Sequence, residues 1–198
     1  MAISIEEIKK LKELTGVGLT DAKVALTEAG GDFDKALEAM RKKGLTKAEK
    51  RGEREARQGI IEAYVHSDRI GVLIELNCET DFVARTDDFK ALAHDIAMQV
   101  AAMSPKFISE SDIPASEIKR KEEELLEAAK QSGKPAGIAK KAVKGQTDKY
   151  FAELTLTNQA FWKDDSKTID DLVKENVAKL GENIIIRQMS RIELGVTE

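Results

Sequence analysis

Several features are scarce in this sequence, and each scarcity excludes a class of protein. The single cysteine among 198 residues, Cys78, cannot form an internal disulfide, so we expect a cytoplasmic protein. No apolar run approaches the roughly 18 residues of a membrane-spanning helix. The formal net charge is -4, which gives no excess of cations for binding nucleic acid. The start of the chain predicts neither a signal peptide nor a transit peptide.

Residues that carry chemistry are also scarce. His66 and His94 are the only histidines, and Cys78 is the only thiol. A Cys–His pair is conceivable, but ordinary packing or solvent exposure fits their placement better. One cysteine and two scattered histidines cannot supply a zinc site, so we expect no metal and no cofactor. A small hydrolase would need a nucleophile beside a base, and the sequence offers none, so we do not expect an enzyme.

The composition favours a soluble, helix-rich protein of one or two domains. Hydrophobic residues make up 41% of the chain, charged residues 34% and aromatic residues 5%. From these proportions and the order of the patterns, the sequence predicts an α+β fold. We expect a three-helix module at 1–45, a charged linker at 46–58 and a core at 59–198.

Caps and glycines divide the module at 1–45 into three short helices. Ser4 and Glu7 form a capping-box pattern at the first helix start. Thr15-Gly16-Val17-Gly18 breaks the chain after it. The remaining boundaries are predicted at Thr20 or Asp21, Gly30-Gly31, Asp32 and Gly44. The core of such a module is thin, which leaves the apolar turn at Val17, Gly18 and Leu19 partly free for a partner.

The linker at 46–58 carries both signs of charge at helical spacing. Such a run is typical of a solvated helix held by local ion pairs, and the alternative is a weak electrostatic guide toward an acidic partner. Alternating residues at 61–65 and 70–76 then predict two strands joined by a turn at Ser67-Asp68-Arg69. A helix is expected from about Asp87 to Met103.

The second half of the chain predicts mainly helices. The region 114–156, broken at Lys134-Pro135, reads as two antiparallel helices or as a projecting coiled-coil arm. A further helix follows Thr168 and ends at Gly181. Residues 183–194 then return as the third strand of an antiparallel sheet packed with helices.

The junction between the second strand and the following helix holds the segment Thr80-Asp81-Phe82-Val83-Ala84-Arg85. A strand-to-helix turn presents its side chains on a rigid mount, where functional residues are common. Residue patterns alone leave two interpretations open. Thr80 or Asp81 caps the helix while Phe82 packs into the core, or Phe82 is displayed to a partner.

Several segments, in order along nearly the whole chain, resemble the translation elongation factor Ts family. Leu11 to Gly18, Asp21-Ala22-Lys23 and Gly31 to Ala36 look like that family's ubiquitin-associated-type head. Thr80-Asp81-Phe82-Val83 is similar to its contact motif. Leu180-Gly181-Glu182-Asn183-Ile184, followed by Arg187, Arg191 and Glu193, resembles its final strand.

The resemblance implies a guanine-nucleotide exchange factor for the GTPase elongation factor Tu. Phe82 would insert between partner helices beside the magnesium site and help GDP to leave. Asp81 would bond to the partner, while Thr80 and Val83 would fix the turn. Secondary contacts would come from Val17, Gly18, Leu19, Lys23 and Arg85.

The chain also looks like the short form of that family, with one strand–helix unit where longer members carry two. The resemblance therefore implies a homodimer, in which a second copy supplies the missing half. The competing hypothesis is a ubiquitin-associated-type adaptor or nascent-chain binding module without exchange activity. That alternative explains the head but gives no role to Thr80–Arg85.

Overall fold

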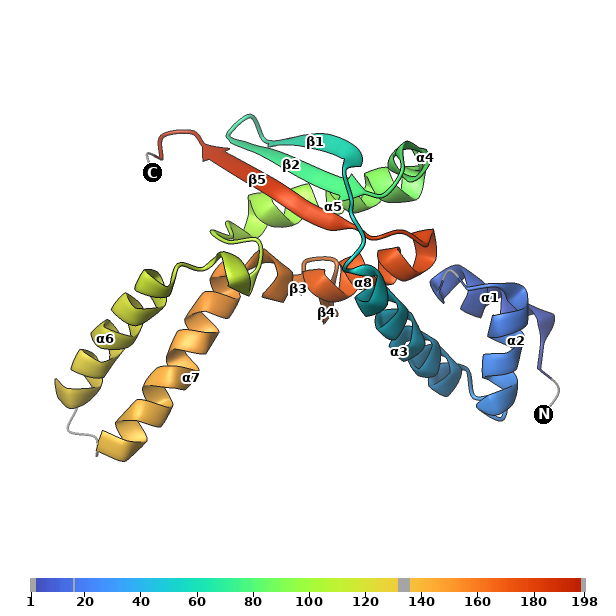
Figure 1. Ribbon diagram of the computed structural model, residues 1–198, viewed down its shortest axis with the longest axis horizontal. Coiled ribbons are helices and arrows are strands. Elements are labelled where there is room, and N and C mark those ends of the chain that lie inside the picture. Colours follow the sequence, from blue (N-terminus) through green and yellow to red (C-terminus); the bar gives the residue numbers. More distant parts are fainter. Residues whose placement is uncertain (1–2, 16, 132–135, 197–198) are drawn as a thin grey trace. The chain divides into compact units, whose positions relative to one another are not determined.

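The computed structural model describes residues 3–15, 17–131 and 136–196, and in these ranges the fold is α+β as predicted (Figure 1). Two compact units are present. One comprises Met1–Met98 with Asp170–Glu198, and the other comprises Gln99–Ile169. The expected breaks at Gly16 and at Lys134-Pro135 lie outside the described residues. The division at 1–45, 46–58 and 59–198 stays a prediction.

Three helices form the amino-terminal bundle: α1 (Ile5–Thr15), α2 (Leu19–Glu28) and α3 (Phe33–Arg51). The predicted capping box is present, because the Ser4 amide donates to Glu7 Oε2 and the Glu7 amide donates to Ser4 Oγ, both at 3.0 Å. The buried side chains that hold the bundle together are Ile8, Leu11, Ala22, Ala25, Leu26, Ala36 and Met40.

Two predicted boundaries in this bundle are wrong. Helix α2 begins at Leu19, with Gly18 at its N-cap and no side-chain cap, rather than at Thr20 or Asp21. Helix α3 does not end at Gly44 but continues to Arg51. A Cβ atom added at Gly44 would lie 3.2 Å from Ala178 Cβ, so this glycine permits a close approach of helices.

Three antiparallel strands make the main sheet: β1 (Gln58–His66), β2 (Ile70–Cys78) and β5 (Ile185–Glu193), in the order β1-β2-β5. This confirms the predicted hairpin and the returning last strand. The turn between β1 and β2 places Ser67 and Asp68 at φ values of 50° and 57°, the left-handed region that suits a tight hairpin.

Helix α5 (Asp87–Met103), with the predicted bounds, covers one face of the sheet (Figure 1). Its buried side chains include Phe89, Leu92 and Ile96, and the sheet contributes Val72, Ile74 and Leu76. The opposite face, which we call the outer face, carries exposed apolar side chains on all three strands. They are Ile61, Val65, Leu73 and Ile192.

The second unit contains the helices α6 (Ala115–Gln131) and α7 (Ala136–Leu154), which agrees with the two helices predicted for 114–156. The small sheet of β3 (Ala160–Phe161) and β4 (Asp164–Thr168) was not predicted. Gln99 is fully buried; its amide donates to Gln159 Oε1 and to the Ala160 carbonyl, both at 3.1 Å.

Helix α8 (Ile169–Leu180) starts directly after Thr168 and ends before Gly181, as predicted. Gly181 has a φ of 82°, the left-handed conformation that often closes a helix. Within the described ranges no helix combines the length and the apolar character needed to cross a bilayer.

Candidate partner-binding site

The segment Thr80–Arg85 forms a separate helical turn between the sheet and α5. Helix α4 (Asp81–Ala84) is only four residues long, and Thr80 is its N-cap, whose hydroxyl accepts a hydrogen bond from the Val83 amide at 3.4 Å. The Thr86 hydroxyl then accepts from the Phe89 amide at 3.3 Å and caps α5. Two successive threonine caps therefore define the path of this segment.

Phe82 projects from this turn into solvent, with 79% of its surface exposed, while Ala84 on the same turn is buried. The interpretation that Phe82 packs into the core is therefore wrong. A phenylalanine this exposed contributes little hydrophobic burial to folding, and a large apolar side chain displayed at a fixed position is typical of a contact with a partner. Val83 is half-buried and Thr80 is partly covered.

Asp81 and Arg85 flank the exposed ring and form an ion pair of 2.8 Å across one helical turn. The Arg85 side chain is largely open to solvent and the Asp81 side chain is about half exposed, so the pair contributes only about 0.2–1 kcal/mol to the stability of the turn. Such a weak pair can be exchanged for partner contacts at low cost.

The base of the turn is fixed by residues that sequence reasoning did not assign to the site. Glu182 Oε1 accepts a hydrogen bond from the Thr80 hydroxyl at 2.6 Å, and Glu182 Oε2 accepts from the Thr80 amide at 2.9 Å. The Asn183 amide donates to Glu79 Oε1 at 2.7 Å. The sequence pattern marked 180–184 only as part of the last strand, and nothing local signals a contact across a hundred residues.

Cys78 lies directly beneath the turn and is fully buried. Its thiol donates to the Thr80 carbonyl at 3.1 Å. Burial, and then the nearby carboxylate of Glu182, raise the pKa of Cys78 to about 11. The thiol is therefore neutral at physiological pH and serves packing rather than nucleophilic chemistry.

The two histidines do not join Cys78. His94 Nδ1 lies 2.8 Å from Glu62 Oε1, and His66 Nδ1 lies 2.9 Å from the Tyr64 hydroxyl. Among the described residues, no group of three or more histidine, cysteine or acidic side chains is arranged to hold a metal ion.

The second predicted group lies in the amino-terminal bundle, at the start of α2. Leu19 and Lys23 are exposed, Gly18 is at the N-cap, and Val17 is partly buried against the bundle core. Leu14 and Val24 add exposed apolar surface that was not predicted from the sequence. In the described part of the chain no hydrogen bond or ion pair joins this group to the Thr80–Arg85 turn.

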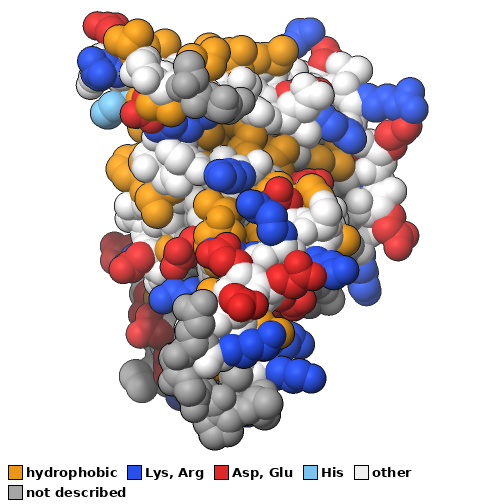
Figure 2. Space-filling model, turned by 90° about the vertical axis from the view of Figure 1, so that its left-hand side faces the viewer, with side chains coloured by type: hydrophobic (Ala, Val, Ile, Leu, Met, Phe, Trp, Pro, Cys, Tyr) orange, Lys and Arg blue, Asp and Glu red, His pale blue; other side chains and the backbone are white. Residues whose placement is uncertain are grey.

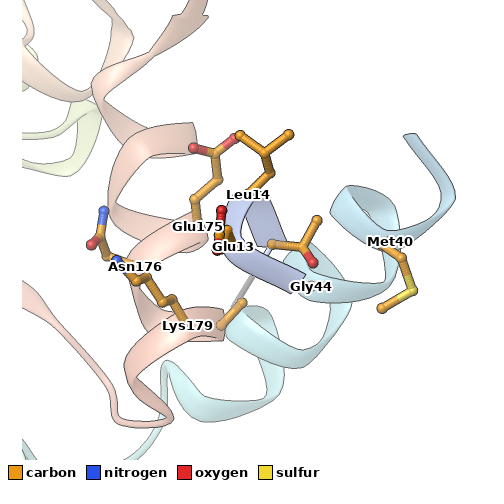
Figure 3. A pocket seen from close by; sticks show the side chains of 9 residues that line it. Glu13, Leu14, Met40, Gly44, Glu175, Asn176 and Lys179 are labelled. Carbon is orange, nitrogen blue, oxygen red and sulfur yellow. The ribbon is translucent and has the colours of Figure 1, made fainter. Parts of the chain in front are cut away.

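A cavity of 240 Å³ opens between the end of α1, α3 and α8 (Figure 3). The side chains of Glu13, Leu14 and Met40 line it together with Glu175 and Asn176 of α8. None of the predicted contact residues is among those that line it. The cavity is therefore separate from the candidate site.

The outer face of the sheet is the other notable surface. Ile61 and Ile192 are each 72% exposed, Val65 is 63% exposed, and Leu194 and Val196 continue the apolar surface beyond β5. Hydrophobic side chains are seen along the top of the molecule in Figure 2. An apolar area of this kind on one side of a sheet is typical of a protein interface.

Comparison with known proteins decides the family. A sequence model described as Elongation factor TS matches residues 45–196. The chain belongs to the elongation factor Ts family. It is 48% identical to the elongation factor Ts of Herpetosiphon aurantiacus, over 98% of this chain and 99% of that protein.

Two further relatives give the same result. The elongation factor Ts of Thermodesulfovibrio yellowstonii is 48% identical over the whole of this chain and 99% of its own length. That of Thermotoga petrophila is 51% identical over 98% of each protein. The family membership predicted from the ordered motifs is confirmed, and it places the chain among the translation elongation factors.

Proposed function

We propose that this chain is a guanine-nucleotide exchange factor that binds elongation factor Tu in its GDP form and promotes release of GDP in the cytoplasm. The observation that carries the proposal is Phe82, which is exposed on a turn held by caps and hydrogen bonds. Membership of the elongation factor Ts family supports the choice of partner. The proposed action is binding without covalent chemistry, so the chain needs no cofactor.

A GTPase holds its nucleotide through a phosphate-binding loop, a helix N-terminus and a magnesium ion. These groups work only in a defined geometry, so a small displacement of partner helices weakens GDP binding. In the proposed mechanism the Phe82 ring inserts between helices beside the magnesium site and displaces them. Asp81 bonds to the partner, while Thr80 and Val83 fix the turn and fill the contact.

General values for aromatic anchors set the size of the contribution expected from Phe82. Burying an exposed phenylalanine contributes about 1.5–3 kcal/mol, and truncating a central anchor costs about 2 kcal/mol or more. A free-energy difference of about 1.4 kcal/mol corresponds to a tenfold change in affinity. Phe82 would therefore account for an acceleration of GDP release by about tenfold to a hundredfold. Other contacts would supply the rest. We assign these to Val17, Gly18, Leu19 and Lys23 of the ubiquitin-associated-like bundle, and to Arg85.

We also propose that two copies of the chain associate through the outer face of the sheet. In a single copy, apolar side chains on three neighbouring strands are exposed to water, which is unfavourable. They are those of Ile61, Val65, Leu73 and Ile192. A two-fold axis would bring the same face of each copy together and cover both. This supplies the second strand–helix unit that longer members of the family carry in one chain.

The proposal is tested by measuring release of a fluorescent GDP analogue from elongation factor Tu after adding the wild-type chain. An exchange factor accelerates release. If the chain lowers the affinity of elongation factor Tu for GDP, GDP lowers the affinity for the chain by the same ratio. The Trp162→Ala variant, which removes another exposed aromatic ring, should release GDP as fast as the wild type. No acceleration by the wild-type chain would overturn the proposal and favour an adaptor.

A further inference from the structure

The loop after α8 and the loop after β2 are joined by reciprocal hydrogen bonds. Glu182 accepts three of them: from the Glu79 amide at 3.1 Å, from the Thr80 amide at 2.9 Å and from the Thr80 hydroxyl at 2.6 Å. In the opposite direction, Glu79 Oε1 accepts from the Asn183 amide at 2.7 Å. A carboxylate from each loop therefore accepts hydrogen bonds from backbone amides of the other loop.

The bond from the Thr80 hydroxyl determines how that hydroxyl can act as a helix cap. A hydroxyl has one proton to donate and lone pairs to accept with. Because its proton goes to Glu182 Oε1, its lone pairs are left to accept from the Val83 amide. The carboxylate thus orients the hydroxyl that starts the turn, and Phe82 lies within that turn.

The loop that carries Glu182 is itself held from its other side. The Asn183 side chain is buried and donates to the carbonyls of Gly52, at 3.3 Å, and Arg54, at 2.7 Å. Arg54 also lies 3.6 Å from the carboxylate of Glu79. The loop that carries Glu182 is therefore held in place by its own hydrogen bonds. As a result, the three hydrogen bonds that Glu182 accepts fix the position of the turn.

We propose that Glu182 is a positioning residue, which holds the Thr80–Arg85 turn in the conformation that presents Phe82 to the partner. The inference rests on the proposed exchange function. Glu182 would not touch the partner's magnesium site and would act through Phe82. Without Glu182 the turn would occupy its competent conformation for only part of the time, and exchange would fall to that fraction of the wild-type value.

The substitution Glu182→Gln keeps the volume and removes the charge. The new amide group can take either of two orientations, and each places its NH₂ group against an existing hydrogen-bond donor. In one orientation the NH₂ group faces the backbone amides of Glu79 and Thr80. In the other it faces the Thr80 hydroxyl, which would then have to turn its proton away from residue 182. Loss of charge-assisted bonds of this kind is expected to slow GDP release by about tenfold.

A double-mutant cycle separates positioning from a general structural effect. GDP release is measured for the wild type, Glu182→Gln, Phe82→Ala and the double variant. We expect Glu182→Gln to slow release in the wild-type background and to have a clearly smaller further effect once Phe82 is truncated, because only the weaker contacts of the turn then remain to be disturbed. Equal slowing in both backgrounds, or none in the wild-type background, would overturn the inference.

Hydrogen exchange of the free chain gives a second readout that does not involve the partner. The amides of Glu79 and Thr80 should exchange faster in Glu182→Gln, and protection elsewhere in the sheet should be unchanged. The matched control is Glu62→Gln, which likewise removes the charge of a carboxylate, here one that contacts His94 away from the turn, and should leave GDP release unchanged. Unaltered protection of both loop amides would contradict the inference.

A second variant covers the case in which Glu182→Gln does not fold. Thr80→Val removes the hydroxyl that Glu182 and Val83 share, and Thr80→Ser restores it. The inference is supported if GDP release from elongation factor Tu is slow with the valine variant and recovers with the serine variant. Equal rates of GDP release with the two variants would overturn it. If Phe82→Ala alone releases GDP as fast as the wild type, the proposed role of Phe82 fails, whatever the Glu182 variants do.

Discussion

Phe82 and Ala84 lie two residues apart on one helical turn, yet the first is 79% exposed and the second is 4% exposed. The small side chain anchors the turn to the fold, and the large one points away from it. Because Phe82 makes so little contact within its own chain, its contribution to function can be separated from its contribution to folding. The effect of magnesium removal and the maximal rate of GDP release both depend on this separation.

Removing magnesium should reduce the advantage of the wild-type chain. In the proposed mechanism Phe82 disturbs the magnesium and phosphate site of elongation factor Tu. A chelator removes the magnesium ion and so weakens GDP binding without Phe82. In excess chelator, GDP release should be fast with either protein, and the ratio of wild-type to Phe82→Ala rates should approach one. The measurement is stopped-flow release of a fluorescent GDP analogue with and without chelator. A ratio that stays at tenfold or more in chelator would place the action of Phe82 away from the metal.

Placing a charge on the outer face should produce monomers. Leu73 lies on the central strand of the sheet with its side chain exposed, so Leu73→Asp would bury an unpaired carboxylate in an interface between copies. Sedimentation should give a dimer for the wild type and a monomer for the variant, with similar melting temperatures at low concentration. The control Ile5→Asp, on exposed α1, should remain dimeric. A wild-type chain that is strictly monomeric and still exchanges nucleotide would rule out the dimer.

The thiol of Cys78 should make stability fall at alkaline pH. Its pKa is about 11 in the fold, against 9.0 as the ordinary value, so between these pH values the unfolded chain loses the proton while the folded chain keeps it. Stability conferred by the neutral thiol is therefore complete below pH 9 and is lost as the pH rises toward 11.

The measurement is urea unfolding of the wild type and of Cys78→Ala at several pH values. The variant loses packing at every pH, but the difference between the two proteins should narrow as the pH rises from 9 to 11. A difference that does not change over that range would contradict the assigned pKa. In the folded wild type at pH 8, the buried thiol should also resist thiol reagents until the chain unfolds.

Gly59 should tolerate no side chain. Its φ is 152°, and an added Cβ atom would lie 2.1 Å from the Leu76 carbonyl oxygen across the β1–β2 pair. Gly59→Ala should therefore lower the free energy of unfolding by several kcal/mol, roughly 3 or more, or prevent folding. Gly71→Ala, on the neighbouring strand, meets nothing within 4 Å and is the matched control. Equal stability of the two variants by chemical denaturation would contradict the described register.

Local patterns were sufficient for much of the fold. The Ser4–Glu7 cap, the hairpin around Ser67-Asp68 and the bounds of α5 all follow from signals within a few residues. The small sheet of β3 and β4 was missed because Asp164–Thr168 is polar throughout and shows no alternation. Its pairing depends on tertiary contacts around Gln99, which no local pattern reveals.

The candidate site was predictable only in part. Residue patterns identified the Thr80–Arg85 turn but left the position of Phe82 open, and the family resemblance was needed to give the ring a role. The contact between Glu182 and Thr80 joins residues 102 positions apart, so it depends on how the last helix and strand return to the sheet. Helix α3 continues past Gly44 for the same kind of reason, since packing there outweighs a weak local stop signal.

The role of Phe82 is tested most directly by the maximal rate of GDP release from elongation factor Tu at saturating Phe82→Ala, compared with the rate at saturating wild-type chain. We expect a maximal rate about tenfold or more lower for the variant. The free energy of unfolding should change by less than about 0.5 kcal/mol, because the ring is exposed. Equal maximal rates for the two proteins would contradict the central claim that Phe82 drives nucleotide release.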